Sequence, residues 1–199
     1  MNRLARLAKA WFLPVAVWLA GLVAFAVLGI DGLFAGPNPV FVIARVTAYA
    51  TAVMVVAVTA AFVAMFGLAA AAMLVWLGGS PTPGLIVTTM SRSFWWVAVY
   101  VWLGVVLLIV DPPVALTVFE LSDRNALENR VRNTTAFAWM GRLRYLALIG
   151  FLVTSLWLLA RHARPVNALL AVAFGVAAMA ALLTALGLLA GPSEAPGVL

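Results

Sequence analysis

The sequence contains no cysteine and a single histidine, His162. Without cysteine the chain cannot form a disulfide, a thiolate metal site or an iron–sulfur cluster, and it offers no cysteine nucleophile. One histidine cannot supply the paired ligands of a bis-histidine haem or of a multi-histidine metal centre. We therefore expect a chain with no catalytic residues, no metal site and no cofactor, which acts by some means other than catalysis.

Charge is also scarce. Only 9% of the 199 residues are charged and 66% are hydrophobic, whereas soluble domains average about 25% charged and about 45–50% apolar residues. The mean hydropathy is +1.16. A soluble domain of this size could not bury so much apolar surface, so the composition predicts an all-α, polytopic transmembrane helix bundle whose solvent is the lipid bilayer.

Five long apolar runs predict five spanning helices in a single membrane domain covering residues 1–199. Their approximate bounds are 10–30, 46–77, 93–110, 145–160 and 166–190. About 20 helical residues cover the roughly 30 Å of a bilayer core, and Pro- and Gly-rich breaks separate the runs.

The first run has a competing interpretation as a signal peptide, because a basic start and an apolar core precede Ala24-Phe25-Ala26. The run continues to Ile30, which favours an uncleaved helix.

The charged residues between the third and fourth runs predict an extramembrane segment at 111–144. Within it, Asn125 followed three residues later by Glu128 is typical of a helix start and predicts an interfacial helix near 126–134. The candidates for acid–base chemistry gather in the same segment: Asp111, Glu120, Ser122, Asp123 and Glu128. Five nearby arginines favour a salt-bridge network or a docking surface over an active site.

Arg45 is the one charge between residues 40 and 77. Near the start of a helix its stem can lift the guanidinium among lipid headgroups, and we favour this interpretation over a pore, substrate or counter-ion role. The stretches 40–45 and 85–92 are expected at the membrane interface. Three arginines of the charged segment are further candidate functional residues: Arg124, Arg130 and Arg132.

Small residues recur at four-residue spacing in the fifth run, at Ala173, Ala177, Ala181 and Ala185. Such stripes let helices approach closely in lipid, where packing drives association. We expect this stripe to pack within the chain, and the alternative is a face for self-association or for a partner subunit.

Basic residues split evenly between the two sides of the predicted bundle, so the positive-inside rule does not decide the orientation. The compact basic start with Arg3, Arg6 and Lys9 favours an inside N-terminus and an outside C-terminus, in a bacterial cytoplasmic membrane. The net charge of +6 comes from bases at membrane boundaries, which fits anionic lipid headgroups and not nucleic acid.

Two local patterns resemble the Yip-domain integral membrane proteins over about residues 60–190. One is the Leu77-Gly78-Gly79 break before the third helix, and the other is the turn Arg161-His162-Ala163-Arg164 running into Ala168-Leu169-Leu170-Ala171. The resemblance implies a five-helix fold with a cytoplasmic N-terminus. The Asp-Leu-Tyr-Gly-Pro signature of the trafficking members and their proline in the third helix are missing, so no trafficking or GTPase-binding role is carried over.

Our first functional hypothesis is a non-enzymatic accessory, scaffold or assembly subunit of a membrane complex. The second is a small-solute or lipid transport component, whose route would be lined by Arg45 and helix threonines, namely Thr47, Thr51, Thr59, Thr88 and Thr154. A membrane enzyme that uses the carboxylates of the charged segment is the third.

Overall fold

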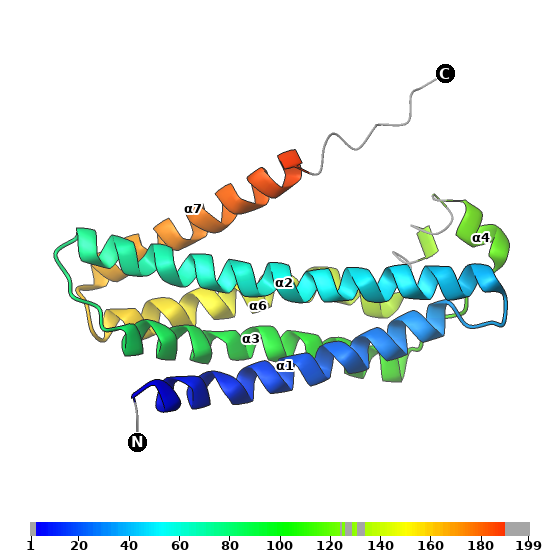
Figure 1. Cartoon of the computed structure of the whole chain (residues 1–199), viewed down its shortest axis with the longest axis horizontal. Coiled ribbons are helices and arrows are strands. Elements are labelled where there is room, and N and C mark those ends of the chain that lie inside the picture. Colours follow the sequence, from blue (N-terminus) through cyan, green and yellow to red (C-terminus); the bar gives the residue numbers. More distant parts are fainter. Residues whose placement is uncertain (1–2, 124, 126–128, 131–133, 190–199) are drawn as a thin grey trace.

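The structure is a computed structural model that describes residues 3–123, 125, 129–130 and 134–189. Five long helices run back and forth along one axis (Figure 1), and the described residues contain no strand. The element bounds are α1 Arg3–Leu33, α2 Pro39–Trp76, α3 Pro83–Val110, the short α4 Val118–Ser122, α6 Thr135–Ala160 and α7 Pro165–Leu189.

All five long helices contain segments long and apolar enough to cross a membrane. The chain is therefore an integral membrane protein with an all-α bundle, and the prediction of five spans is confirmed. We call the end that holds the start of α1, the α2–α3 loop and the α6–α7 turn the proximal end, and the opposite end the distal end (Figure 1).

Local sequence signals set the helix starts. The side chain of Asn38 accepts a hydrogen bond from the amide of Val40 at the start of α2, and Thr82 caps α3 in the same way. A proline follows each of these caps, where its fixed φ and missing N–H suit the first helical turn. After α2 the chain turns at Gly78, whose φ of 80° favours glycine.

Four of the long helices begin well before the bounds that the apolar runs predict. The second starts at Pro39 and not near Val46, so Arg45 lies inside it. The third starts at Pro83, so residues 85–92 are helical and not a separate interfacial stretch. The fourth starts at Thr135, ten residues early, which shortens the segment between α3 and α6 to 111–134. Helical backbone hydrogen bonding continues through polar residues, whereas hydropathy falls at the first charge; side-chain caps mark the early starts of α2 and α3, and α6 starts without one.

The first helix likewise begins at Arg3 and not near Ala10. The predicted interfacial helix near 126–134 falls mostly outside the described residues. The structure instead shows α4, whose capping box joins Thr117 and Glu120.

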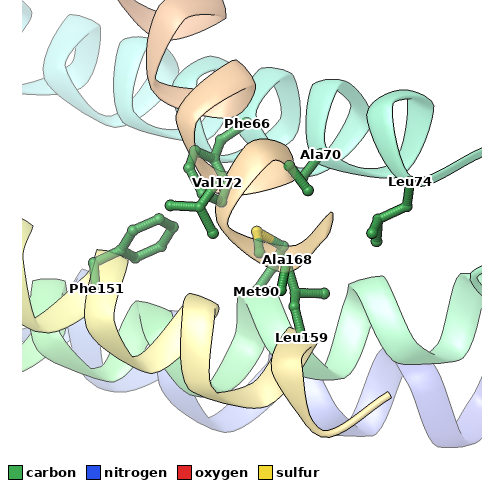
Figure 2. Close-up of a cluster of buried hydrophobic side chains, with 9 residues drawn as sticks. Phe66, Ala70, Leu74, Met90, Phe151, Leu159, Ala168 and Val172 are labelled. Atoms are coloured by element: carbon green, nitrogen blue, oxygen red, sulfur yellow. The ribbon is translucent and has the colours of Figure 1, made fainter. Parts of the chain in front are cut away.

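Helix α3 is central and packs along both α1 and α6, while α2 packs mainly against α7 and touches α1 only sparsely. The largest buried cluster joins α2, α3, α6 and α7 (Figure 2). At its centre the rings of Phe66 and Phe151 meet edge-on, with centroids 5.2 Å apart. Gly175 of α7 lies against the ring of Phe66, so the small stripe that packs within the chain is Ala168, Ala171 and Gly175.

One polar contact is buried in the α3–α6 interface. The hydroxyl of Ser155 donates to the hydroxyl of Ser93 at 2.8 Å, and both residues are 0% exposed. In a low-dielectric interior, a polar group deprived of its partner costs more than the bond contributes.

We expect Ser155→Ala to lower the free energy of unfolding by about 1 kcal/mol, the scale of such bonds between membrane helices. The double variant Ser93→Ala/Ser155→Ala should lose less than the sum of the two single losses, because it leaves no orphaned hydroxyl. Unfolding by SDS titration in mixed micelles measures both. Strictly additive losses would show that the two hydroxyls are not coupled.

Candidate functional site: an arginine near the middle of the bundle

Arg144 lies well inside α6, away from both ends of the helix. Nine helical residues precede it, which places it about 14 Å from the start of the helix. The 26 residues of α6 extend about 39 Å, so a 30 Å hydrocarbon core centred on them leaves Arg144 roughly 9 Å inside its nearer face. That depth exceeds the span of the three methylenes by which an arginine reaches an interface.

The surroundings of Arg144 support this depth independently. It lines a cavity of about 340 Å³ together with residues from the middle parts of α2 and α3, among them Thr59 and Tyr100. Helix α7 contributes Met179. Residues of four of the five long helices therefore line the cavity to which the exposed Arg144 contributes.

The hydrogen bonds near Arg144 are made by neutral groups. Its Nη2 donates to the hydroxyl of Tyr145 at 2.8 Å, and its guanidinium lies 4.8 Å from the centroid of that ring. The hydroxyl of Tyr100 donates to the carbonyl of Met140 at 3.3 Å. These contacts orient the cation without neutralising its charge.

The helices offer Arg144 no carboxylate. Asp31 is the one acidic residue in the sequences of the five long helices, and it lies two residues before Leu33, the distal end of α1. An arginine near the middle of a bilayer is costly, and such groups normally pair with an opposite charge or face a polar cavity. The described helices therefore place no carboxylate near the level of Arg144.

Arg142 lies nearer to the end of α6 and differs in its environment. Its guanidinium lies 5.4 Å from the ring centroid of Trp139, a residue in the second turn of the helix. Tryptophan and arginine side by side near a helix end are typical of the membrane interface. Arg142 is therefore a natural comparison for Arg144.

Arg45, the candidate favoured by sequence, sits in the second turn of α2 and is partly buried. Its Nη2 donates to the carbonyl of Gly36 at 3.5 Å, across the α1–α2 loop. This contact directs the guanidinium toward the distal end, in agreement with the interfacial interpretation and not with a role at mid-depth.

The described carboxylates of the charged segment make local contacts, and the candidate Glu128 lies outside the described residues. Among the described residues no group of three potential metal ligands occurs. Asp123 accepts a hydrogen bond from the amide of Asn125, and Glu120 from the amide of Thr117, both at 2.9 Å. The Thr117 amide and hydroxyl, with a smaller effect of Arg130, lower the pKa of Glu120 from 4.5.

Of the three candidate arginines in that segment, Arg130 is described, and its Nε lies 3.9 Å from Oε1 of Glu120. This long ion pair is the part of the predicted salt-bridge network that the described residues show. Arg124 and Arg132 lie outside the described residues.

The alanine stripe of α7 does not pack within the described bundle. Ala173, Ala177, Ala181 and Ala185 are all exposed, whereas the buried face of the helix is the neighbouring stripe around Ala171 and Gly175. The expectation of intramolecular packing is therefore wrong for these four residues. Figure 1 shows the distal half of α7 leaning away from the other helices.

The helix threonines do not line one continuous route. Thr59 lines the Arg144 cavity, and Thr88 lines a separate cavity at the proximal end. Thr47 and Thr51 donate to carbonyls one turn back in α2. Thr154 accepts a hydrogen bond from Trp96.

Comparison of the chain with models of known protein families, with curated proteins and with solved structures finds no match. The resemblance to Yip-domain proteins therefore stays a prediction. Interpretation of function rests on the geometry around Arg144 and on the two ends of the bundle.

Proposed function

We propose that the protein is a non-enzymatic accessory or assembly subunit of a membrane complex. The observation that carries this proposal is the depth of Arg144 combined with the lack of any acidic residue near its level in the helices. A carboxylate in a spanning helix of another protein would supply the missing charge. A desolvated pair of this kind fixes both the register and the identity of the partner.

The required partner is chemically different from this chain. A second copy would bring a second Arg144, and its spans contain no acid except Asp31 near the distal end. Like charges at one depth repel each other, so a symmetric dimer through this cavity is disfavoured. The exposed alanine stripe on α7 offers a close-packing face for the same partner.

The engagement of the carboxylates supports a role without catalysis. Glu120 is held by its capping box and Asp123 by a local backbone bond, so in the described part of the chain they face different partners. Catalysis by paired carboxylates would need them to converge on one pocket.

We propose a bacterial cytoplasmic membrane with the N-terminus inside. With Arg144 counted within the bilayer, six bases belong to the proximal end, and five belong to the other side: Arg45, Arg130 and Arg142 by their described positions, and Arg124 and Arg132 by sequence alone. The positive-inside rule counts bases near the helix ends, so this recount favours a cytoplasmic proximal end.

The test is chemical cross-linking in native membranes, followed by purification in a mild detergent and mass spectrometry. The proposal expects a partner that has an Asp or Glu within a spanning segment. Association should fail with Arg144→Glu and return when the partner's acid is changed to arginine. Recovery of the chain as a lone monomer after cross-linking would contradict the proposal.

A small-solute transport component is the second candidate, because the cavity of about 340 Å³ could hold a small anion beside Arg144. Saturable binding of such an anion by the purified chain alone, lost in Arg144→Gln, would favour this candidate over assembly.

A further inference from the structure

A second cavity, distinct from that of Arg144, lies at the proximal end of the bundle. Its volume is about 580 Å³, and it is bounded by the α2–α3 loop, the first turns of α3, the end of α6 and the α6–α7 turn. Its polar lining consists of Ser80, Thr82, Thr88, Thr89, Arg92 and His162. No acidic side chain lines it.

Arg92 is the cation of this proximal cavity. It is exposed, and in the described part of the chain its guanidinium takes part in no ion pair or hydrogen bond. The proximal end has no acid to offer: it carries Arg92, Arg161 and Arg164 together with the basic start of the chain. The charge at this cavity is thus positive and uncompensated.

Thr89 supplies a second polar group to the cavity. The residue is 1% exposed and lines the cavity, and its hydroxyl oxygen is not among the buried polar atoms of the described residues that lack a partner, so it is open to the cavity. Thr88, by contrast, donates to the carbonyl of Gly84 at 2.7 Å. A hydroxyl open to the cavity can donate to an acceptor that a ligand supplies there.

His162 can add a further contact. A carbonyl only accepts, so Nδ1 of His162 carries the proton of its 3.1 Å hydrogen bond to the carbonyl of Leu158. The other ring nitrogen, Nε2, is not engaged by that bond.

We propose that the proximal cavity binds a phosphate group. Phosphate oxygens accept two parallel hydrogen bonds from a guanidinium and can accept another from a hydroxyl that lines the same cavity, which matches Arg92 and Thr89. A loop and a turn that follow spanning helices lie at the level of lipid headgroups. The phosphate belongs either to an anionic phospholipid or to free orthophosphate. This site is independent of Arg144 and of the proposed function.

The experiment is isothermal titration of the full-length chain in a neutral detergent. One arm uses short-chain phosphatidylglycerol, and the other uses sodium phosphate at constant ionic strength. We expect saturable binding that weakens about tenfold or more in Arg92→Gln, and severalfold in Thr89→Val, which removes the hydroxyl but keeps the shape. Arg92→Lys should retain part of the affinity, because the charge remains but the planar pair of donors is lost.

Arg161→Gln is the matched control. Arg161 lies in the same turn as His162 but does not line the cavity, and its guanidinium stacks 3.5 Å from the ring centroid of Trp157. Its loss should change the affinity less than twofold. If Arg92→Gln lowers the yield of folded protein, the affinity of Thr89→Val is compared with that of the unchanged chain instead.

Each outcome is decisive. Binding in the lipid arm alone, with the expected dependence on Arg92, assigns the site to phospholipid. The same dependence with sodium phosphate assigns it to the free ion. The proposal fails if neither ligand binds saturably, if Arg92→Gln and Thr89→Val both bind like the unchanged chain, or if Arg161→Gln weakens binding as much as Arg92→Gln.

Discussion

Arg144→Leu is expected to stabilise the isolated chain in the bilayer and to abolish its association with a partner. Removing an arginine from the middle of a spanning helix saves about 2.5–3.5 kcal/mol of insertion free energy on translocon-based scales, although its depth in α6 makes the lower end more realistic. The same change leaves the partner's carboxylate desolvated and unpaired. Losing one member of a buried charge pair costs about 2–5 kcal/mol of binding, or roughly 30-fold to several thousand-fold in affinity.

A recognition residue is distinguished from a structural one because its replacement raises the stability of the isolated chain while it lowers the affinity for the partner. The insertion efficiency of the α6 segment and its unfolding in SDS report on the isolated chain, and cross-linking yield reports on the complex. Arg142→Leu is the control, because Arg142 carries the same charge on the same helix but lies beside Trp139 near the end. If Arg144→Leu destabilised the chain and left the complex intact, the arginine would be part of the fold and not of an interface.

Gly150→Val is expected to be the most destabilising single substitution at the α3–α6 interface. A Cβ at position 150 would overlap the indole ring of Trp96, three of whose atoms crowd the glycine. The indole cannot swing aside freely, because its Nε1–H donates to Thr154 of α6 at 2.8 Å. Overpacking a fixed contact typically costs about 1–3 kcal/mol, and the two extra methyl groups of valine place the expected loss at the upper end.

Gly141→Val provides the comparison within the same helix, since nothing lies within 4 Å of a Cβ added there. Replacing a helical glycine in open space removes backbone freedom from the unfolded chain, so it should be neutral or slightly stabilising. Reversible unfolding in mixed micelles gives both values. Equal losses of unfolding free energy in Gly141→Val and Gly150→Val would show that helix propensity, and not the contact with Trp96, determines the stability of these variants.

The number of spanning helices could be predicted from composition because the bilayer allows few alternatives. Runs of about twenty apolar residues must form all their backbone hydrogen bonds internally, and a helix does so within one segment. The helix ends were less predictable. Hydropathy falls at Arg92 and at Arg144, yet the helices continue through both residues. Helix α3 starts at Pro83, behind the Thr82 cap, and so precedes Arg92. Helix α6 starts at Thr135, nine residues before Arg144.

Arg144 was missed for that same reason. Treating a charge as the end of a span placed it in the extramembrane segment, where an arginine needs no explanation. One signal in the sequence could have found it: the stretch 135–141 carries no charge and includes Trp139, which together are compatible with a further two turns of helix. The cavity partners Thr59 and Tyr100 come from other helices and could not be read from local spacing.

The packing face of α7 could not be predicted from its sequence, for a different reason. Its two stripes of small residues, around Ala171 and around Ala173, are chemically equivalent in sequence. Only the position of Phe66 on α2 decides between them, because its ring fills the space beside Gly175. Long-range contacts of this kind are set by the shapes of both helices, and the pattern of one helix does not contain them.

The depth of the Arg144 cavity is the central claim, and the absence of cysteine makes it directly measurable. A nitroxide can be attached at Leu148→Cys, which lines that cavity, and at Ala115→Cys and Ala163→Cys near the distal and proximal ends. Power saturation with oxygen and with a water-soluble nickel complex reports how deep each nitroxide lies in the bilayer. The nitroxide at position 148 should favour oxygen strongly, while those at positions 115 and 163 should favour the nickel complex. A nitroxide at 148 as accessible to nickel as one at 115 would contradict that claim.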